Sequence, residues 1–294
     1  MRRITYYPGC SLKDEAKGFE ESALSVFSAM GVELDEMPRW NCCGTVYSLA
    51  EDNLMKQLAP VRNLIRVQDR GENSVYTMCA MCFNTLKRAN SLVREDSEKL
   101  EKINAFMDLE NDYDGSVEVK HLLELLRDEM GLDAVSEQVK RPLAGRKVAP
   151  YYGCMLTRPA GVGVEDPHDP QIFDQLIRAL GGEAVEYPYR TECCGSYNTV
   201  DHRQAVSEKV GVIVQSALEH GAETIITGCP LCHYNLDTRQ ADLLEQKSSL
   251  TPLPVLYFTQ LMALAFGLPD SCRFDDHAID PRPVLNTANA APKR

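Results

Sequence analysis

One pattern of five cysteines occurs twice in this 294-residue chain. The first set is Cys10, Cys42, Cys43, Cys79 and Cys82, and the second set is Cys154, Cys193, Cys194, Cys229 and Cys232. The copies are offset by 144 residues at the first cysteine, by 151 at the adjacent pair and by 150 at the Cys-x-x-Cys. A repeat of half the chain length indicates two related units. Roughly 150 residues are enough for each unit to bury its own core.

The residues beside the cysteines repeat as well. Tyr-Tyr-Pro-Gly-Cys in the first half corresponds to Tyr-Tyr-Gly-Cys in the second, and each adjacent pair is followed by glycine, at Gly44 and Gly195. We therefore divide the chain into a first domain at residues 1–143, a second at 144–270 and a C-terminal tail at 271–294.

Hydrophobic spacing predicts alternating strands and helices in both halves, which is typical of small, mainly parallel sheets covered by helices. The fold class is therefore α/β, with two duplicated, pseudo-symmetric halves. The expected strands are 4–7, 32–36, 74–78 and 117–119, then 184–187, 224–227 and 254–257. The expected helices are 19–30, 49–68 and 122–130, then 171–180, 203–220 and 259–266.

Cys10 follows the first predicted strand, Cys42 and Cys43 follow the second, and Cys79 and Cys82 follow the third, and we expect the second set to repeat this placement. Loops at the carboxyl ends of parallel strands meet at one edge of a sheet, so the five sulfurs of each half should converge there. Both Cys-x-x-Cys pairs should begin a helix, where free backbone N–H groups and the helix dipole favour the thiolate that binds metals.

Eleven cysteines in a chain without a signal segment indicate thiols that bind metal or carry out redox chemistry. Zinc is one possibility, but a zinc ion is coordinated by four ligands and would leave one thiolate of each half without a metal. Adjacent cysteines suit neighbouring irons better, so we place iron–sulfur clusters ahead of zinc. A reducing compartment and the odd number of cysteines argue against a disulfide network, and a thioredoxin-like dithiol leaves the other three cysteines of each set unexplained. Cys272 lies outside both sets and is expected to be a free thiol.

The motif Cys-x31-Cys-Cys-Gly-x34-Cys-x2-Cys, followed by Cys-x38-Cys-Cys-Gly-x33-Cys-x2-Cys, resembles the tandem CCG cysteine-rich domain. Over about residues 1 to 270 the chain is similar to the B subunits of heterodisulfide reductases. The resemblance implies that each five-cysteine set holds a non-cubane 4Fe-4S cluster. It also implies cleavage of a small anionic disulfide, such as that of coenzyme M and coenzyme B, between the two clusters. Cys42, Cys43, Cys193 and Cys194 are the expected catalytic residues.

The chain lacks a ferredoxin-type cysteine run and a Gly-x-Gly-x-x-Gly fingerprint. Electrons must then come from another polypeptide. The resemblance implies a ferredoxin-like C subunit in direct contact, and behind it a flavin-containing A subunit. We also expect exposed patches that such partners cover.

An excess of acidic residues, 43 against 31 basic ones, argues against a nucleic-acid or anionic-membrane surface. The most apolar stretch, 255–268, is too short and interrupted to span a bilayer, so we expect a cytoplasmic protein.

An anionic substrate would need a group of basic residues at the opening of its binding site, which we call the basic mouth. The candidates near the cysteine loops are Lys13, Lys17, Arg39, Arg158, Arg190 and Arg203. His233, next to Cys232, is either a proton donor to a departing thiolate or a packed side chain.

Two alternatives stay open. CCG domains also serve thiol-linked fumarate reductases, certain succinate dehydrogenases and lactate or glycolate oxidation systems. A zinc-binding scaffold without chemistry of its own is the other alternative.

Overall fold

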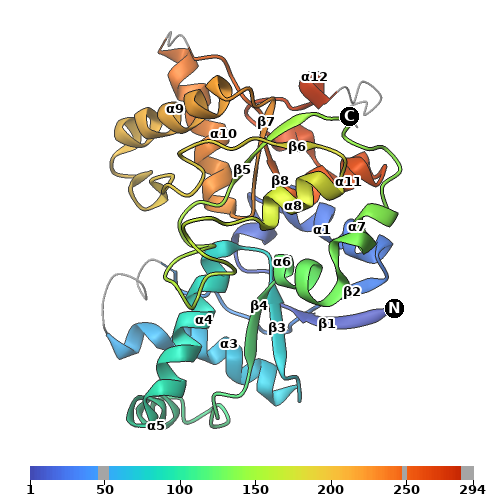
Figure 1. The fold of residues 1–294 in the computed structure, drawn as a ribbon. Helices are drawn as coiled ribbons and strands as arrows, with labels where there is room; N and C mark the ends of the chain where they lie inside the picture. The colour runs from blue at the N-terminus through green and yellow to red at the C-terminus, as the bar shows by residue number, and fades with distance from the viewer. Residues whose placement is uncertain (46–52, 247–249, 286–294) are drawn as a thin grey trace.

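The computed structural model describes residues 1–45, 53–246 and 250–285, which form two four-stranded parallel sheets (Figure 1). The first sheet has the order β2-β1-β3-β4, and the second has the matching order β6-β5-β7-β8. The duplicated α/β fold predicted from the sequence is therefore confirmed. The strands are β1 Arg2–Tyr6, β2 Val32–Glu36, β3 Ser74–Thr77, β4 Glu118–His121, β5 Lys147–Tyr151, β6 Glu183–Ala184, β7 Thr224–Thr227 and β8 Val255–Tyr257.

Helices cover both sheets, as right-handed crossovers between parallel strands require. The first half contains α1 Lys17–Ala29, α3 Leu58–Asp69, α4 Ala80–Glu95, α5 Ser97–Phe106, α6 Leu122–Glu124 and α7 Leu132–Glu137. The second half contains α8 Ile172–Ala179, α9 Arg203–Glu219, α10 Pro230–Glu245, α11 Phe258–Ala265 and, in the tail, α12 Arg282–Leu285.

Three elements differ from the prediction. The helix expected at 49–68 is a 3₁₀ turn at Leu54–Gln57 followed by α3, and residues 49–52 lie outside the described residues. The helix expected at 122–130 is the short α6 continued by a π-helical segment. The strand expected at 184–187 pairs only at Glu183–Ala184, because it is an edge strand and Pro188 soon follows.

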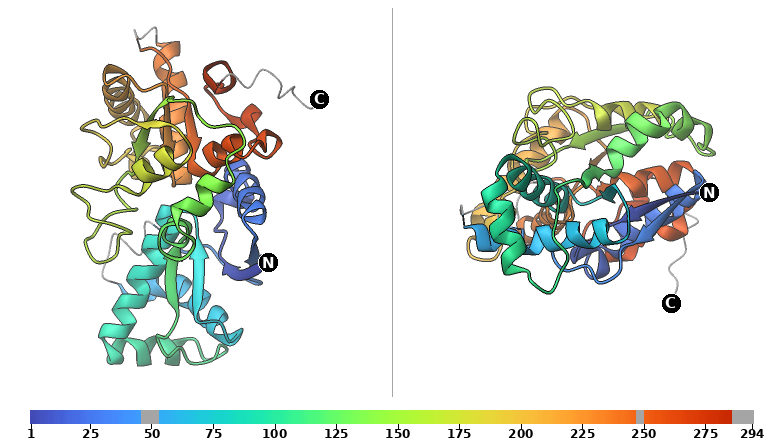
Figure 2. Two further views of the ribbon diagram at one scale, coloured as in Figure 1. Left: turned by 45° about the vertical axis from the view of Figure 1, so that its right-hand side comes forward. Right: turned by 90° about the horizontal axis from the view of Figure 1, so that it is seen from below.

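The two halves share one core, because the closing helix of each half packs on the first helix of the other. α1 lies against α11, and α7 lies against α8 (Figure 2). Phe19 of α1 stacks on Tyr257 with ring centroids 4.2 Å apart and meets Phe258 edge-on. The hydroxyls of Ser22 and Thr259 are 2.6 Å apart in the same contact.

A backbone hydrogen bond joins the halves at the start of α4. Ala80 N donates to the carbonyl of Gly228 at 3.0 Å. The reciprocal bond would come from Pro230, which has no N–H. In that bond the acceptor would have been the carbonyl of Met78. This carbonyl instead accepts a hydrogen bond from Nε2 of buried His121, at 2.8 Å.

His121 should make stability depend on pH. Burial lowers its pKa to about 3, and Nδ1 already accepts the N–H of Leu123, so a second proton has no place. The unfolded state binds that proton below about pH 6.5. Below about pH 6.5, the free energy of unfolding should therefore decrease as the pH is lowered, by up to about 1.4 kcal/mol per pH unit.

Chemical denaturation of wild type and His121→Asn between pH 7 and pH 5 measures this contribution. Asparagine still caps α6 but does not titrate, so the variant should show a shallower dependence. Parallel curves for the two proteins would contradict the assignment.

Candidate metal centre at the interface of the two halves

Both Cys-x-x-Cys motifs begin a helix, as the sequence predicts. Cys79 is the N-cap of α4 and Cys82 lies in its first turn. Cys229 and Cys232 take the same places on α10. The backbone N–H groups of a first helical turn have no intrahelical partner, so both positions favour negative charge on sulfur.

The first cysteine set gathers in space. Cys10 Sγ lies 3.7 Å from Cys42 Sγ, and Cys43 Sγ lies 3.6 Å from Cys82 Sγ. Cys79 hydrogen-bonds Cys82 in the same group. Cys10 and Cys42 are exposed, whereas the other three are buried.

The second set has the same arrangement, and its cysteines are more buried than those of the first set. Cys194 Sγ lies 3.5 Å from Cys232 Sγ, and Cys154 hydrogen-bonds Cys193. Cys193 also accepts the backbone N–H of Gly195 at 3.3 Å. Cys154 and Cys193 are half-buried, so neither set is sealed from the surface.

The sulfur separations test whether these residues suit a metal centre. Two thiolates that share a tetrahedral metal with bonds of about 2.3 Å lie about 3.8 Å apart. The observed 3.5 to 3.7 Å matches that spacing and is far from a disulfide bond of about 2 Å. Five sulfurs in each half exceed the four ligands of a zinc ion, so the donor set fits a cluster of several irons.

The two sets touch at the interface of the halves. The thiols of Cys79 and Cys229 lie close enough to interact across the interface. Cys229 is the largest influence that raises the pKa of Cys79, while hydrogen bonding to Cys232 and to Cys79 lowers the pKa of Cys229. Two metal centres bound to these sets would be neighbours.

In each half, at least one thiol of the adjacent pair ionises easily. A hydrogen bond from Cys154 lowers the pKa of Cys193 to about 2, and a hydrogen bond from Cys42 lowers that of Cys43. Neighbouring thiols hold their protons, because close like charges oppose a second ionisation. Cations are therefore needed before all five sulfurs of one set can be thiolates together.

Two tyrosines fix the loops that carry the adjacent cysteines. Tyr7 donates its hydroxyl hydrogen to the carbonyl of Asn41 at 2.9 Å, and Tyr151 donates to Glu192 at 2.7 Å. Asn41 and Glu192 each precede a cysteine pair. The sequence analysis assigned these tyrosines no role, although their repetition beside each Gly-Cys was the available signal.

Glycine before the first cysteine of each set allows close approach to the Cys-x-x-Cys. A Cβ on Gly9 would lie 2.8 Å from Cys82 Sγ, and one on Gly153 would lie 3.2 Å from Cys232 Sγ. Both glycines also have positive φ, at +75° and +63°. A residue other than glycine would therefore lack space for its side chain and would strain the backbone at either position.

Half of the predicted basic residues are neutralised by carboxylates. Lys13 pairs with Glu20 and Glu36. Two others do the same: Arg190 pairs with Asp169 and Asp174, and Arg203 with Asp242. Lys17 and Arg39 form no ion pair within the described residues. Arg158 differs from all of these, because it lines a cavity beside Cys154 together with Arg88, which the sequence analysis missed.

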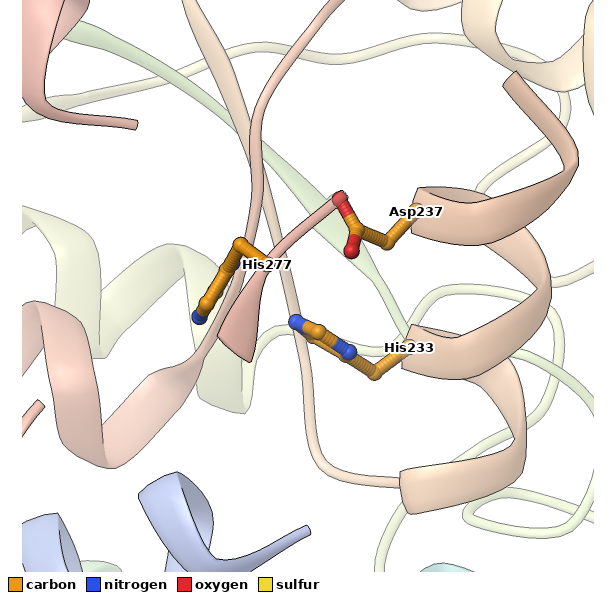
Figure 3. A group of neighbouring side chains, drawn as sticks. All are labelled: His233, Asp237 and His277. Carbon is orange, nitrogen blue, oxygen red and sulfur yellow. The ribbon is translucent and has the colours of Figure 1, made fainter. Parts of the chain in front are cut away.

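His233, Asp237 and His277 form a separate polar cluster (Figure 3). His233 and Asp237 lie one turn apart on α10, and His277 faces them from the C-terminal segment, with ligand atoms within 4.8 Å of one another. Asp237 accepts two backbone N–H bonds from residues 278–279, and burial raises its pKa to about 6.

Hydrogen bonds in this cluster argue against a metal ion. Gln260 accepts the N–H of Tyr257 and donates to the carbonyl of Cys272, which fixes its amide. Its second hydrogen then points at Nε2 of His277, 2.9 Å away, so the proton of a neutral His277 is on Nδ1. Protonated Nδ1 of His277 therefore has no free lone pair with which to bind a metal ion.

His233 itself is buried and packed. Its Nε2 donates to the carbonyl of Val255 at 3.1 Å, and its ring stacks on Tyr257 at 4.2 Å. These contacts favour the packed interpretation over the proton donor. Cys272 is a free thiol, and it is fully buried.

A cavity of about 490 Å³ joins the halves beside the first cysteine set. Cys10 lines one side, and Leu231, His233 and Tyr257 line the other. Val200 and Tyr234, which also line it, are exposed. A small organic molecule fits this volume.

The cysteine-rich domain CCG matches at residues 4–87 and 148–237, once in each half. The chain belongs to the CCG cysteine-rich domain family. It is 31% identical over 271 residues to the 8-methylmenaquinol:fumarate reductase membrane anchor subunit of Wolinella succinogenes, covering 92% of this chain and 94% of the relative. It is 30% identical to a heterodisulfide reductase B-subunit-like protein of Archaeoglobus profundus, covering 91% of each chain.

The B subunit of the ferredoxin:CoB-CoM heterodisulfide reductase of Methanosarcina mazei is 26% identical over 288 residues, covering 95% of this chain and 94% of that one. A crystal structure of a hypothetical protein from Helicobacter pylori has the same fold, with a TM-score of 0.74 at 13% identity. The match covers 94% of this chain and 53% of the Helicobacter chain.

Replacing Gly9 tests the close approach in the first set. Gly9→Ala should displace Cys82 and lower the iron bound to the chain toward half of the wild-type content. Gly71→Ala is the matched control, because Gly71 has a similar φ of +72° and no atom within 4 Å of a built Cβ. Iron and acid-labile sulfide analysis measures both, and equal losses in the two variants would contradict the role of Gly9.

Proposed function

We propose that this chain is the catalytic subunit of a heterodisulfide reductase-type complex in the cytoplasm. It would cleave a small anionic disulfide between two non-cubane 4Fe-4S clusters, one on each five-cysteine set. The contact between Cys79 and Cys229 carries this proposal, because it brings the two sets together where a two-electron reaction needs both. Membership of the CCG family and the relatives named as heterodisulfide reductase subunits support the redox role.

The reaction converts one disulfide, two electrons and two protons into two thiols. The clusters would supply one-electron transfer and sites for thiolate sulfur. The protein supplies the ligand set, with Cys10, Cys42, Cys43, Cys79 and Cys82 in the first half and Cys154, Cys193, Cys194, Cys229 and Cys232 in the second.

The tyrosine hydrogen bonds hold the adjacent cysteines in place. The exposed sulfurs of Cys10 and Cys42, with the half-buried sulfurs of Cys154 and Cys193, leave each centre open to substrate. Cys42, Cys43, Cys193 and Cys194 remain the proposed catalytic cysteines, because one member of each pair, Cys42 or Cys193, is accessible to substrate.

Electrons would come from a ferredoxin-like C subunit in direct contact, and behind it a flavin-containing A subunit. Tyr189, Tyr197 and Val200, within seven residues of the second cysteine pair in the sequence, are exposed, and such a partner would cover them. In the part of the chain that the structure describes, none of the helices is sufficiently long and apolar to span a bilayer.

A CCG component of a fumarate reductase complex is the second candidate. The Wolinella relative supports it, and the cavity of about 490 Å³ beside Cys10 would accept a small organic electron carrier. Assaying the purified complex with disulfides and with fumarate separates the two candidates.

Metal analysis and one substitution test the first candidate. The anaerobically purified chain should hold about eight irons with matching acid-labile sulfide. Cys193→Ser should abolish disulfide cleavage, because it removes a ligand of the second set, whereas Cys272→Ser should leave cleavage unchanged. One or two zinc ions without iron, or full turnover by Cys193→Ser, would refute the proposal.

A further inference from the structure

A positively charged cavity lies beside the second cysteine set. Its volume is about 450 Å³, and Cys154 lines it together with Arg88, Arg158 and His168. Arg88 comes from α4 of the first half, and the other residues follow β5 in the second. None of the described residues that line it is acidic, although the chain has a net charge of −12. We call it the arginine cavity.

Neither arginine is neutralised by a carboxylate of the described residues. Arg88 is half-buried and has no hydrogen bond or ion pair among the described residues. Arg158 donates to the carbonyl of Thr191 at 3.0 Å and, within the same described part of the chain, meets no carboxylate. Of the other basic residues predicted near the cysteine loops, Lys13, Arg190 and Arg203 are paired with carboxylates, and Lys17 and Arg39 do not line this cavity.

Buried Asn84 fixes the geometry of the cavity. It lies one turn before Arg88 on α4, and its Nδ2 donates to the carbonyls of Met155 at 2.9 Å and Arg158 at 2.5 Å. These bonds hold the segment that follows Cys154 against α4. Arg88 and Arg158 are therefore placed on either side of the interface before any ligand arrives.

The space extends beyond the two arginines. A neighbouring cavity of about 390 Å³ shares Arg88, Pro159 and Ala160 with the arginine cavity, and Glu95 also lines it. A ligand larger than an inorganic ion can therefore occupy both, with its anionic group in the arginine cavity and an uncharged part beside Glu95. Paired guanidinium groups in such a site recognise planar or tetrahedral oxyanions through several parallel hydrogen bonds.

We propose that Arg88 and Arg158 bind the anionic group of the substrate, and so direct its sulfur toward Cys154 and the second centre. The substrate would be an organic disulfide or thiol that carries a carboxylate, sulfonate or phosphate. This inference rests on the proposed function, and it assigns substrate orientation to two arginines from opposite halves.

Calorimetric binding to the cluster-loaded chain tests this with three probes. 3-Mercaptopropionate carries a thiol and a carboxylate, 3-mercapto-1-propanol lacks the charge, and succinate lacks the thiol. Arg88→Gln and Arg158→Gln should each raise the Kd of the two acids about tenfold or more and leave that of the alcohol within about twofold. Arg88→Lys should recover part of the loss.

Arg94→Gln is the matched control, because Arg94 lies on the same helix, is exposed and does not line the cavity. It should change no Kd. Equal weakening of the acid and the alcohol, or unchanged binding of the acids, would overturn the inference.

Turnover separates this inference from the proposed function. Disulfide cleavage with an unchanged KM for an acidic disulfide in Arg88→Gln would overturn the arginine site and keep the reaction. Arginine-dependent binding of both acids in a complex that cleaves no disulfide would refute the reaction and support the anion site.

Discussion

The N-termini of α4 and α10 meet at the interface of the two halves, and the rest of the site depends on this meeting. It places Cys79 against Cys229, and the bond from Ala80 to Gly228 fixes the contact through the backbone. Ten sulfurs gathered there cannot all ionise without cations, because buried like charges are costly. A metal centre in each half would therefore stabilise the interface as well as supply the chemistry that we propose.

The two halves are similar in fold but differ in their surroundings. The first cysteine set opens on a large cavity through Cys10, whereas the second opens on the arginine cavity through Cys154. Pro230 and His121 break the symmetry of the backbone at the interface. Such differences would let one substrate be held in a single direction between two similar centres, because Arg88 and Arg158 line the cavity at the second set and not the one at the first.

Much of this could be predicted from the sequence, because strands, helices and cysteine spacing follow from local patterns that occur twice. The positions of β7 and α9 and the helix-initiating Cys-x-x-Cys pairs are examples. The basic mouth could not be predicted, since it depends on which cations find carboxylates in space. Lys13 and Arg203 are paired, whereas Arg88, six residues after Cys82 on the same helix, meets no carboxylate in the part of the chain that the structure describes.

Electron paramagnetic resonance of the partly and fully reduced protein tests the central claim most directly, namely that two metal centres lie side by side across the interface. Paramagnetic centres on adjoining ligand sets should interact, so the fully reduced protein should show broadened or split signals that Cys79→Ser or Cys229→Ser alters in both centres. Two signals that behave independently, or a single centre in the wild-type chain, would contradict the account.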